Sequence, residues 1–135
     1  MIRTINVLII CLLIHTISVA QLTLTIEINE LRNNTGQIHI EISNEQEVRV
    51  VGVTKSISDN KSLIIIENLN PGRYAFKFFH DENKNEKLDV NWLEIPKEGF
   101  GFSNNPSMTF GPPSFDKTIF ELNESIVIKC KPKYF

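Results

Sequence analysis

Residues 22–28 decide the fold, and they read LTLTIEI. Apolar side chains at every second position, from Leu22 to Ile28, alternate with threonine and glutamate. A period of two places all the apolar side chains on one face, so this stretch predicts a half-buried β-strand. Residues 37–42 (QIHIEI) repeat the pattern after a turn cluster that ends in Gly36, where we expect a positive φ. We expect these two strands to pair antiparallel, with His39 on the polar face as a solvated surface histidine.

Further short strands are predicted over residues 48–55, 62–69 and 74–80, and a closing hairpin is predicted over 119–122 and 125–130. The run from Ile64 to Ile66 suggests a strand buried on both faces. No stretch after residue 20 has the 3.6-residue apolar period of a helix. About seven short strands separated by turns predict an all-β fold, a single-domain antiparallel β-sandwich of the immunoglobulin or transthyretin-like kind.

The first 20 residues are predicted to be a secretory signal peptide. Arg3 precedes an apolar run over residues 5–17, and Ser18-Val19-Ala20 supplies the small residues of a cleavage site after Ala20. The apolar run is about 13 residues, shorter than the ~20 that a spanning helix needs, so an uncleaved anchor is the disfavoured alternative. We therefore expect an exported protein, periplasmic or extracellular, with no transmembrane span after cleavage and one domain over residues 21–135.

Charge and cysteine content limit the kinds of binding partner and of covalent crosslink that we expect for this domain. Arg3 is the only charged residue of the first 20, so 13 basic and 16 acidic residues remain and the formal charge is −3. Such a surface offers no net attraction to nucleic acid, and it carries no dense basic block. Cys130 is the only cysteine left after cleavage, which excludes an internal disulfide. Its spacing from Ile126 and Ile128 predicts a buried small apolar residue.

The segment 81–116 breaks the alternating pattern after the fifth strand. It holds four of the six prolines and three of the six glycines, and it is rich in aromatic residues. A loop of this length in a compact domain is usually functional or disordered. The aromatic content argues against disorder, so we expect a long ordered loop that covers one end of the sandwich.

The start of this loop, DENKNEKLD over residues 81–89, predicts a Ca²⁺ site. Oxygen-bearing side chains fall at relative positions 1, 3, 5 and 9, and position 7 supplies a backbone carbonyl, as in calcium loops of the EF-hand type. The expected metal ligands are Asp81, Asn83, Asn85, Lys87 through its carbonyl, and Asp89. Glu86 stands where such loops place a glycine, and Trp92 stands where they place a bidentate glutamate, so Glu94 or Glu98 would supply the additional carboxylate. The alternative is a hydrated turn whose side chains bond their own backbone.

The second half of the segment contains GFGFSNN over residues 99–105 and FGPPSF over residues 110–115. The phenylalanines are expected mainly to cap the core. The alternative is a ligand cleft for a sugar or peptide, lined by Trp92, Phe100 and Phe102, with Asn104 and Asn105 as hydrogen-bonding groups.

These motifs carry a family resemblance. The stretches HDEN (80–83), KLD (87–89), EGFGFSNN (98–105) and GPPSF (111–115) closely resemble an exported bacterial family catalogued as domain of unknown function 2141. The resemblance covers essentially the whole of residues 21–135 and implies a β-sandwich outside the cytoplasm. It implies no activity. Members of the family usually carry a glycine where this chain has Glu86.

Together these observations favour a non-catalytic exported module, stabilised by Ca²⁺, that binds a protein or glycan partner at the cell envelope. A structural or adhesion component of an envelope assembly is the first alternative. A small hydrolase is the second, with His80 beside Asp81, a nucleophile at Ser103 or Ser114, or Glu94 and Glu98 as an acid–base pair. We find no complete catalytic constellation and expect no enzyme activity.

Overall fold

The computed structural model describes residues 20–135, so the predicted signal peptide, apart from Ala20, lies outside the described residues. The chain from Leu22 to Cys130 forms eight β-strands and one short 3₁₀ helix. In order these elements are β1 (Leu22–Ile28), β2 (Gln37–Asn44), β3 (Arg49–Ser56), β4 (Ser62–Leu69), β5 (Gly72–Asp81), β6 (Phe100–Phe102), η1 (Phe115–Lys117), β7 (Phe120–Leu122) and β8 (Ile126–Cys130). The all-β prediction is confirmed. Within the described part of the chain, no helix is long and apolar enough to cross a membrane.

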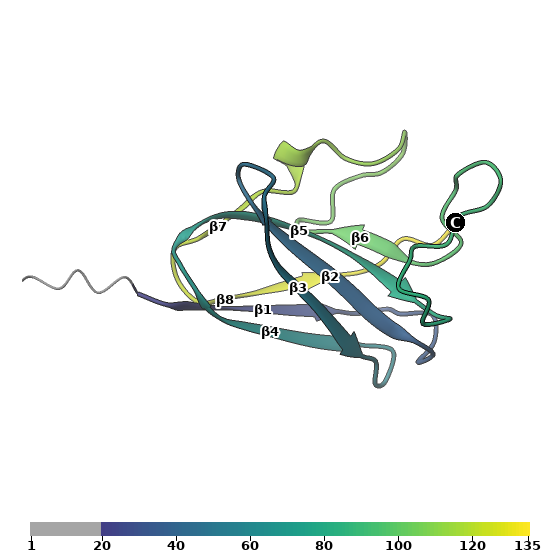
Figure 1. The fold of residues 1–135 in the computed structure, drawn as a ribbon, viewed down its shortest axis with the longest axis horizontal. Helices are drawn as coiled ribbons and strands as arrows, with labels where there is room; N and C mark the ends of the chain where they lie inside the picture. Colours follow the sequence, from purple (N-terminus) through teal and green to yellow (C-terminus); the bar gives the residue numbers. More distant parts are fainter. Residues whose placement is uncertain (1–19) are drawn as a thin grey trace, which may run out of the picture.

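The strands form two sheets that face each other (Figure 1). In the smaller sheet β1 lies between β4, to which it is antiparallel, and β8, to which it is parallel. In the larger sheet β2 lies between β3 and β5, and all pairs are antiparallel. The far edge of β5 is shared, because β6 pairs with residues 77–79 and β7 pairs with residues 72–74. The predicted sandwich is confirmed. It has one strand more than the seven predicted, because β6 lies inside the segment 81–116 that was predicted to be a loop.

Two predicted strand pairings are wrong. The predicted pairing of β1 with β2 does not occur, because the two strands lie in different sheets and face each other across the core. The predicted closing hairpin is also absent, since β7 belongs to the larger sheet and β8 to the smaller one. In both cases the alternating pattern correctly gives the buried face of each strand. The pattern does not identify the neighbouring strand. The inner face of a strand is buried against the opposite sheet whichever strands flank it in its own sheet.

The core is built from the alternating positions of both sheets. On β1 the side chains of residues 22, 24, 26 and 28 are buried, and on β2 those of residues 38, 40 and 42 are buried. Full burial of one such isoleucine or leucine stabilises the fold by about 1.5–3 kcal/mol. The expectation of burial on both faces at β4 is wrong, because Ile65 is 56% exposed between the buried Ile64 and Ile66. This smaller sheet has an outer face that no described element covers.

Gly36 is required where the chain enters β2. It has a φ of +81°, as expected, and a Cβ there would lie 1.9 Å from the carbonyl oxygen of Asp81. No other residue permits this close approach, so Gly36 sets the distance between the start of β2 and the end of β5, where the candidate site begins.

Cys130 is buried at the end of β8, as expected, and it is not in a disulfide. Burial raises the pKa of its thiol to about 11. The thiol is therefore neutral at physiological pH, as is usual for a cysteine that serves the core.

Candidate functional site

Asp81, the last residue of β5, is the anchor of the 81–89 loop. Its side chain is fully buried. Oδ1 accepts the N–H of Asn85 at 3.0 Å, and Oδ2 accepts the N–H of Glu86 at 2.9 Å and lies 2.9 Å from Nε2 of His39. Burial raises the pKa of Asp81, but the hydrogen bonds from Glu86, His39 and Asn85 outweigh it and hold that pKa below its usual value. The carboxylate is therefore charged and fixed in place at neutral pH.

His39 is not the solvated surface histidine that its polar neighbours suggested. Its side chain is only 18% exposed and its ring stacks on Phe79 with centroids 4.9 Å apart. His39 pairs with Phe79 in the register of β2 and β5, and this register also brings His39 near Asp81. Nδ1 lies 3.1 Å from the hydroxyl of Thr54 on β3. Sequence reasoning missed His39 because its partners lie on two other strands.

The loop itself is a tight turn held by asparagine side chains. Oδ1 of Asn83 accepts the N–H of Asn85, and Oδ1 of Asn85 accepts the N–H of Lys87. The Nδ2 groups of both asparagines donate to Asp89, at 2.6 Å and 2.9 Å. Residues 83, 85 and 89 are thus joined through their side chains, and Asp81 joins the same hydrogen-bonded group through the backbone N–H of Asn85. The bonds to backbone N–H groups are those that the alternative, a hydrated turn, predicts, and Lys87 takes part through its backbone N–H.

Glu86 adopts a left-handed backbone conformation with a φ of 63°. This is the conformation for which calcium loops use glycine at the sixth position. A side chain costs on the order of 1 kcal/mol in this region. Glu86 therefore has the left-handed backbone expected at the sixth position, with a side chain where glycine would be less strained.

The two additional glutamates lie in different places. Glu98 is buried, and its carboxylate accepts the N–H of Glu82 at 2.8 Å and the N–H of Asp89 at 3.0 Å. Glu98 therefore closes the base of the loop by joining its two ends. Glu94 is exposed on the next turn and has a φ of 61°. Across residues 20–135, no group of three or more His, Cys, Asp or Glu side chains is placed to hold a metal ion.

His80 lies at the inner end of β5 in a separate buried network. Its Nε2 lies 2.7 Å from the carbonyl oxygen of Thr35 and its Nδ1 lies 2.8 Å from the hydroxyl of Tyr134. Arg32 stacks on the ring of Tyr134 at 4.7 Å and pairs with Glu82 at 2.6 Å. Burial raises the pKa of Glu82, and the hydrogen bond from Arg32 outweighs it and lowers that pKa. This network attaches the C-terminal segment to the start of the loop.

The serines expected as nucleophiles have other surroundings. Ser103 is fully buried, and its hydroxyl accepts the N–H of Phe76 and donates to the carbonyl of Thr118. Ser114 is exposed and precedes η1. The hydrogen bonds of His80 go to neither serine.

The aromatic residues of the segment divide between a cavity and the surface. A cavity of about 360 Å³ is lined by residues of four segments, among them Phe100, Phe102, Met108 and Phe135. Trp92 is outside this lining and 88% exposed. The amide groups of Asn104 and Asn105 donate to backbone carbonyls, the former to Lys117 and Ile119 and the latter to Lys129. These two asparagines therefore fix the segment after β6 onto its neighbours.

Comparison with known proteins gives a family and no activity. Neither a curated protein nor a solved structure matches the chain. The family described as "Uncharacterized protein conserved in bacteria (DUF2141)" matches residues 26–129, which run from within β1 to within β8 and hold the whole 81–89 loop. The chain therefore belongs to this bacterial family, as its HDEN, EGFGFSNN and GPPSF motifs indicated.

Proposed function

We propose that the protein is an exported, non-catalytic β-sandwich module that binds Ca²⁺ through the 81–89 loop and a protein or glycan partner at the cell envelope. The observation that supports calcium is the convergence of four side chains on one small region. Asp89 accepts hydrogen bonds from the side-chain amide groups of Asn83 and Asn85, while Asp81 accepts one from a backbone N–H of the same turn.

The donor set suits a hard cation. Carboxylate, amide and backbone oxygens are the ligands that Ca²⁺ takes, commonly six to eight of them. Asp81 and Asp89 supply the negative charge, and Oδ1 of Asp81 accepts a single hydrogen bond, which leaves it acceptor capacity for a cation. For Asn83 and Asn85 to act as ligands, their amide oxygens must replace the Nδ2 groups that now face Asp89. The cation would then bind Asp89 in place of the hydrogen bonds that these uncharged amide groups donate to it.

Calcium would stabilise the fold because its ligands are attached to two neighbouring strands. Asp81 is part of β5, and Asp89 is held by Glu98, which lies in the segment that enters β6. A ligand that binds only the folded state at a hundredfold excess over its Kd adds about 2.7 kcal/mol to the free energy of unfolding. In a domain of this size that corresponds to an increase in Tm on the order of 10 °C.

The test is calorimetric titration of residues 20–135 with Ca²⁺, together with thermal unfolding in calcium and in EDTA. Asp89→Ala removes one carboxylate from the partly exposed side of the loop, and we expect it to abolish the heat of binding and the calcium-dependent rise in Tm. Glu67→Gln is the matched control, since Glu67 is an exposed acidic residue on β4, outside the hydrogen-bonded group. An unchanged Tm in EDTA and the absence of binding heat in the unaltered protein would eliminate calcium from the proposal.

A small hydrolase is the second candidate, supported by one observation. With the ring proton of His39 on Nε2, which lies 2.9 Å from Asp81 and 3.0 Å from the side-chain amide of Gln37, Nδ1 can accept the proton of the Thr54 hydroxyl at 3.1 Å. A hydroxyl, an imidazole and a carboxylate in this order are the parts of an activated nucleophile. Assays of ester and peptide hydrolysis with the unaltered protein and with Thr54→Val decide between the two. Turnover that the substitution abolishes would replace the non-catalytic proposal with a hydrolase.

A further inference from the structure

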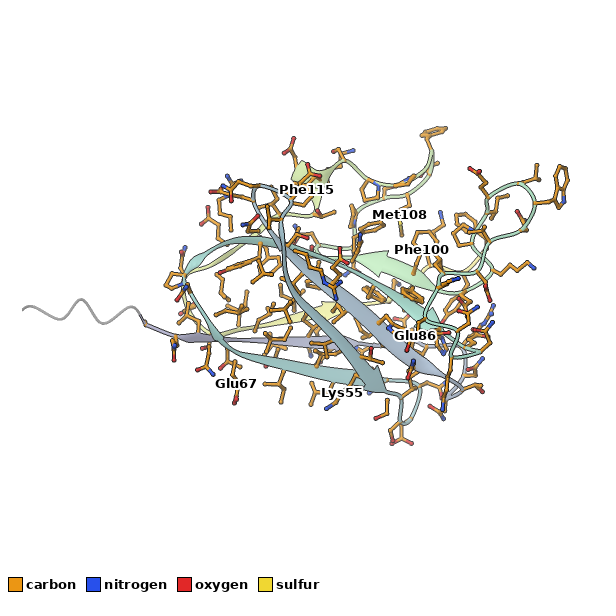
Figure 2. All side chains as sticks on the ribbon, in the orientation of Figure 1. Lys55, Glu67, Glu86, Phe100, Met108 and Phe115 are labelled. Atoms are coloured by element: carbon orange, nitrogen blue, oxygen red, sulfur yellow. The ribbon has the colours of Figure 1, made fainter. Side chains whose placement is uncertain are left out.

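Two aromatic side chains at the tips of neighbouring loops make almost no contact with the rest of the domain. Trp92 is 88% exposed and Phe110 is 103% exposed. Their loops follow β5 and β6 and project from the same end of the sandwich (Figure 1), where Figure 2 places Met108 and Phe100. Neither side chain contributes to the core, so the fold gives no reason for their presence.

The loop that carries Trp92 is ordered rather than loose. The N–H of Asn91 donates to the carbonyl of Ile95 at 2.9 Å, and its Oδ1 accepts the N–H groups of Leu93 and Ile95 at 2.8 and 3.0 Å. An isolated β-bridge between Val90 and Pro96 closes the turn. The turn thereby holds four exposed apolar side chains away from the domain, namely Val90, Trp92, Leu93 and Ile95.

The second loop is free of charge over a long stretch. From Ser103 to Phe115 the chain contains no Asp, Glu, Lys or Arg, although these residues make up 22% of the whole sequence. This loop is also fixed in place, because the ammonium group of Lys133 donates to the carbonyl of Met108 at 3.0 Å. A contiguous exposed apolar patch often marks an interaction surface, whereas one exposed apolar side chain does not, so Phe110 bears on function only together with the apolar residues near it.

The space between the two loops is apolar as well. The cavity of about 360 Å³ is lined on one side by Ile95 and Pro96, which follow Trp92, and on the other by Met108 and Pro112, which flank Phe110. The cavity lies between the loops that carry Trp92 and Phe110, and we call the two tips together with this cavity the apolar end.

Basic residues border the apolar end. Lys131 has a side chain that is 63% exposed and pairs with Glu30 at 3.6 Å, Lys97 is exposed, and Lys133 lies over the ring of Phe135 at 4.4 Å. The second tip is uncharged, and the first carries one charged side chain, the exposed Glu94 between Leu93 and Ile95. Apolar side chains at the loop tips with cations at the border of the same surface match a bilayer, whose apolar interior lies beneath a layer of phosphate groups.

We propose that the apolar end inserts into the interface of a lipid bilayer, with Trp92 and Phe110 among the acyl chains and the lysines at the phosphate groups. The inference rests on the proposed function only in taking this end as the binding surface, and it names the membrane itself as the envelope partner. A glycan is disfavoured because Asn104 and Asn105 already bond backbone carbonyls. Two separately projecting tips suit a deformable surface better than a protein groove, and tryptophan is favoured at membrane interfaces.

The chain provides its own reporter, since Trp92 is the only tryptophan. The test uses residues 20–135, which contain every residue of the described core, with vesicles of phosphatidylcholine alone and of phosphatidylcholine mixed with phosphatidylglycerol. We expect the emission of Trp92 to shift to shorter wavelength and to become protected from iodide. We also expect tighter binding to the anionic mixture than to phosphatidylcholine alone.

Substitutions locate the contact. Phe110→Ser keeps the reporter and should weaken the vesicle partition constant on the order of tenfold, the change expected from withdrawing one large apolar side chain. Trp92→Ala, followed by co-sedimentation, should do the same. Ile65→Ser is the control, because Ile65 is an equally apolar exposed residue on the smaller sheet and should leave partitioning unchanged.

The outcomes separate the two proposals. Unshifted Trp92 emission with both vesicle types, or a Phe110→Ser variant that partitions like the unaltered protein, would overturn insertion. If the emission of Trp92 shifts with purified envelope glycan or protein instead, the bilayer is the wrong partner while the binding function stands. Asp89→Ala tests calcium binding alone. If this variant still binds vesicles, insertion is independent of the metal and stands even where the calcium proposal fails.

Discussion

Oε2 of Glu98 accepts the backbone N–H of Asp89 at 3.0 Å, and so joins the end of the 81–89 loop to the segment that enters β6. The other oxygen of the same carboxylate accepts the N–H of Glu82 at 2.8 Å. One buried side chain thereby holds both ends of the candidate calcium loop. We therefore expect the shape of the loop to depend on Glu98.

Substitution of Glu98 tests this role. Glu98→Gln replaces one accepting oxygen with a donor that opposes a backbone N–H, and we expect the free energy of unfolding to fall by about 1–2 kcal/mol. Glu98→Ala leaves both N–H groups without their partner and should cost about 2–4 kcal/mol. Urea denaturation measures both values. Glu94→Gln, at an exposed position, should change stability by less than about 0.5 kcal/mol. Equal stability of all three variants would show that Glu98 does not hold the loop.

Glu86→Gly should stabilise the protein. Glu86 has a φ of 63°, where a side chain is unfavourable and glycine is not. We expect the substitution to raise the free energy of unfolding by up to about 1 kcal/mol. If the loop binds Ca²⁺ in this conformation, the same substitution should also tighten calcium binding. A lower Tm for Glu86→Gly would mean that the side chain contributes more than its backbone conformation costs.

Gly36→Ala is the opposite case. The added Cβ would lie 1.9 Å from the carbonyl oxygen of Asp81 and 2.6 Å from Cα of Glu82, at a φ of +81°. Strain and overlap together should destabilise the domain by about 2–4 kcal/mol. Because the overlap falls on the first residues of the loop, we expect amide hydrogen exchange to accelerate there more than in β1. Wild-type stability of this variant would rule out the close contact between Gly36 and Asp81.

Cys130 should make stability depend on pH in the alkaline range. Burial raises the pKa of its thiol from 9.0 to about 11, so below pH 9 the thiol is neutral in both the folded and the unfolded chain and its contribution is constant. Between these two values the unfolded chain loses the proton first. Stability should therefore decline as the pH rises, by roughly 3 kcal/mol in total. Cys130→Ala should remove this part of the decline in denaturation curves measured from pH 8 to pH 11. An identical pH profile for the variant would contradict the raised pKa.

The alternation of residues 22–28 and 37–42 was sufficient to predict two strands and their buried faces. It was not sufficient to predict their neighbours, since β1 pairs with β4 and β8 while β2 pairs with β3 and β5. Periodicity is a property of a few consecutive residues, whereas strand order depends on how whole segments pack. The same limit explains β6, whose three residues are too few to show a period and form a strand only because β5 offers them a free edge.

The candidate site divides in the same way. The spacing of Asp81, Asn83, Asn85 and Asp89 lies within nine residues, so the sequence alone determined that these side chains meet in one turn. Local geometry also determined the left-handed backbone at Glu86. The tertiary structure decided everything that joins this turn to distant residues: His39 from β2 reaches Asp81, Thr54 from β3 reaches His39, and Glu98 is buried beneath the turn. It also decided that Trp92 and Phe110 are exposed on separate loops. Burial and charge neutralisation depend on which segments come together in space, and a sequence read residue by residue does not contain that information.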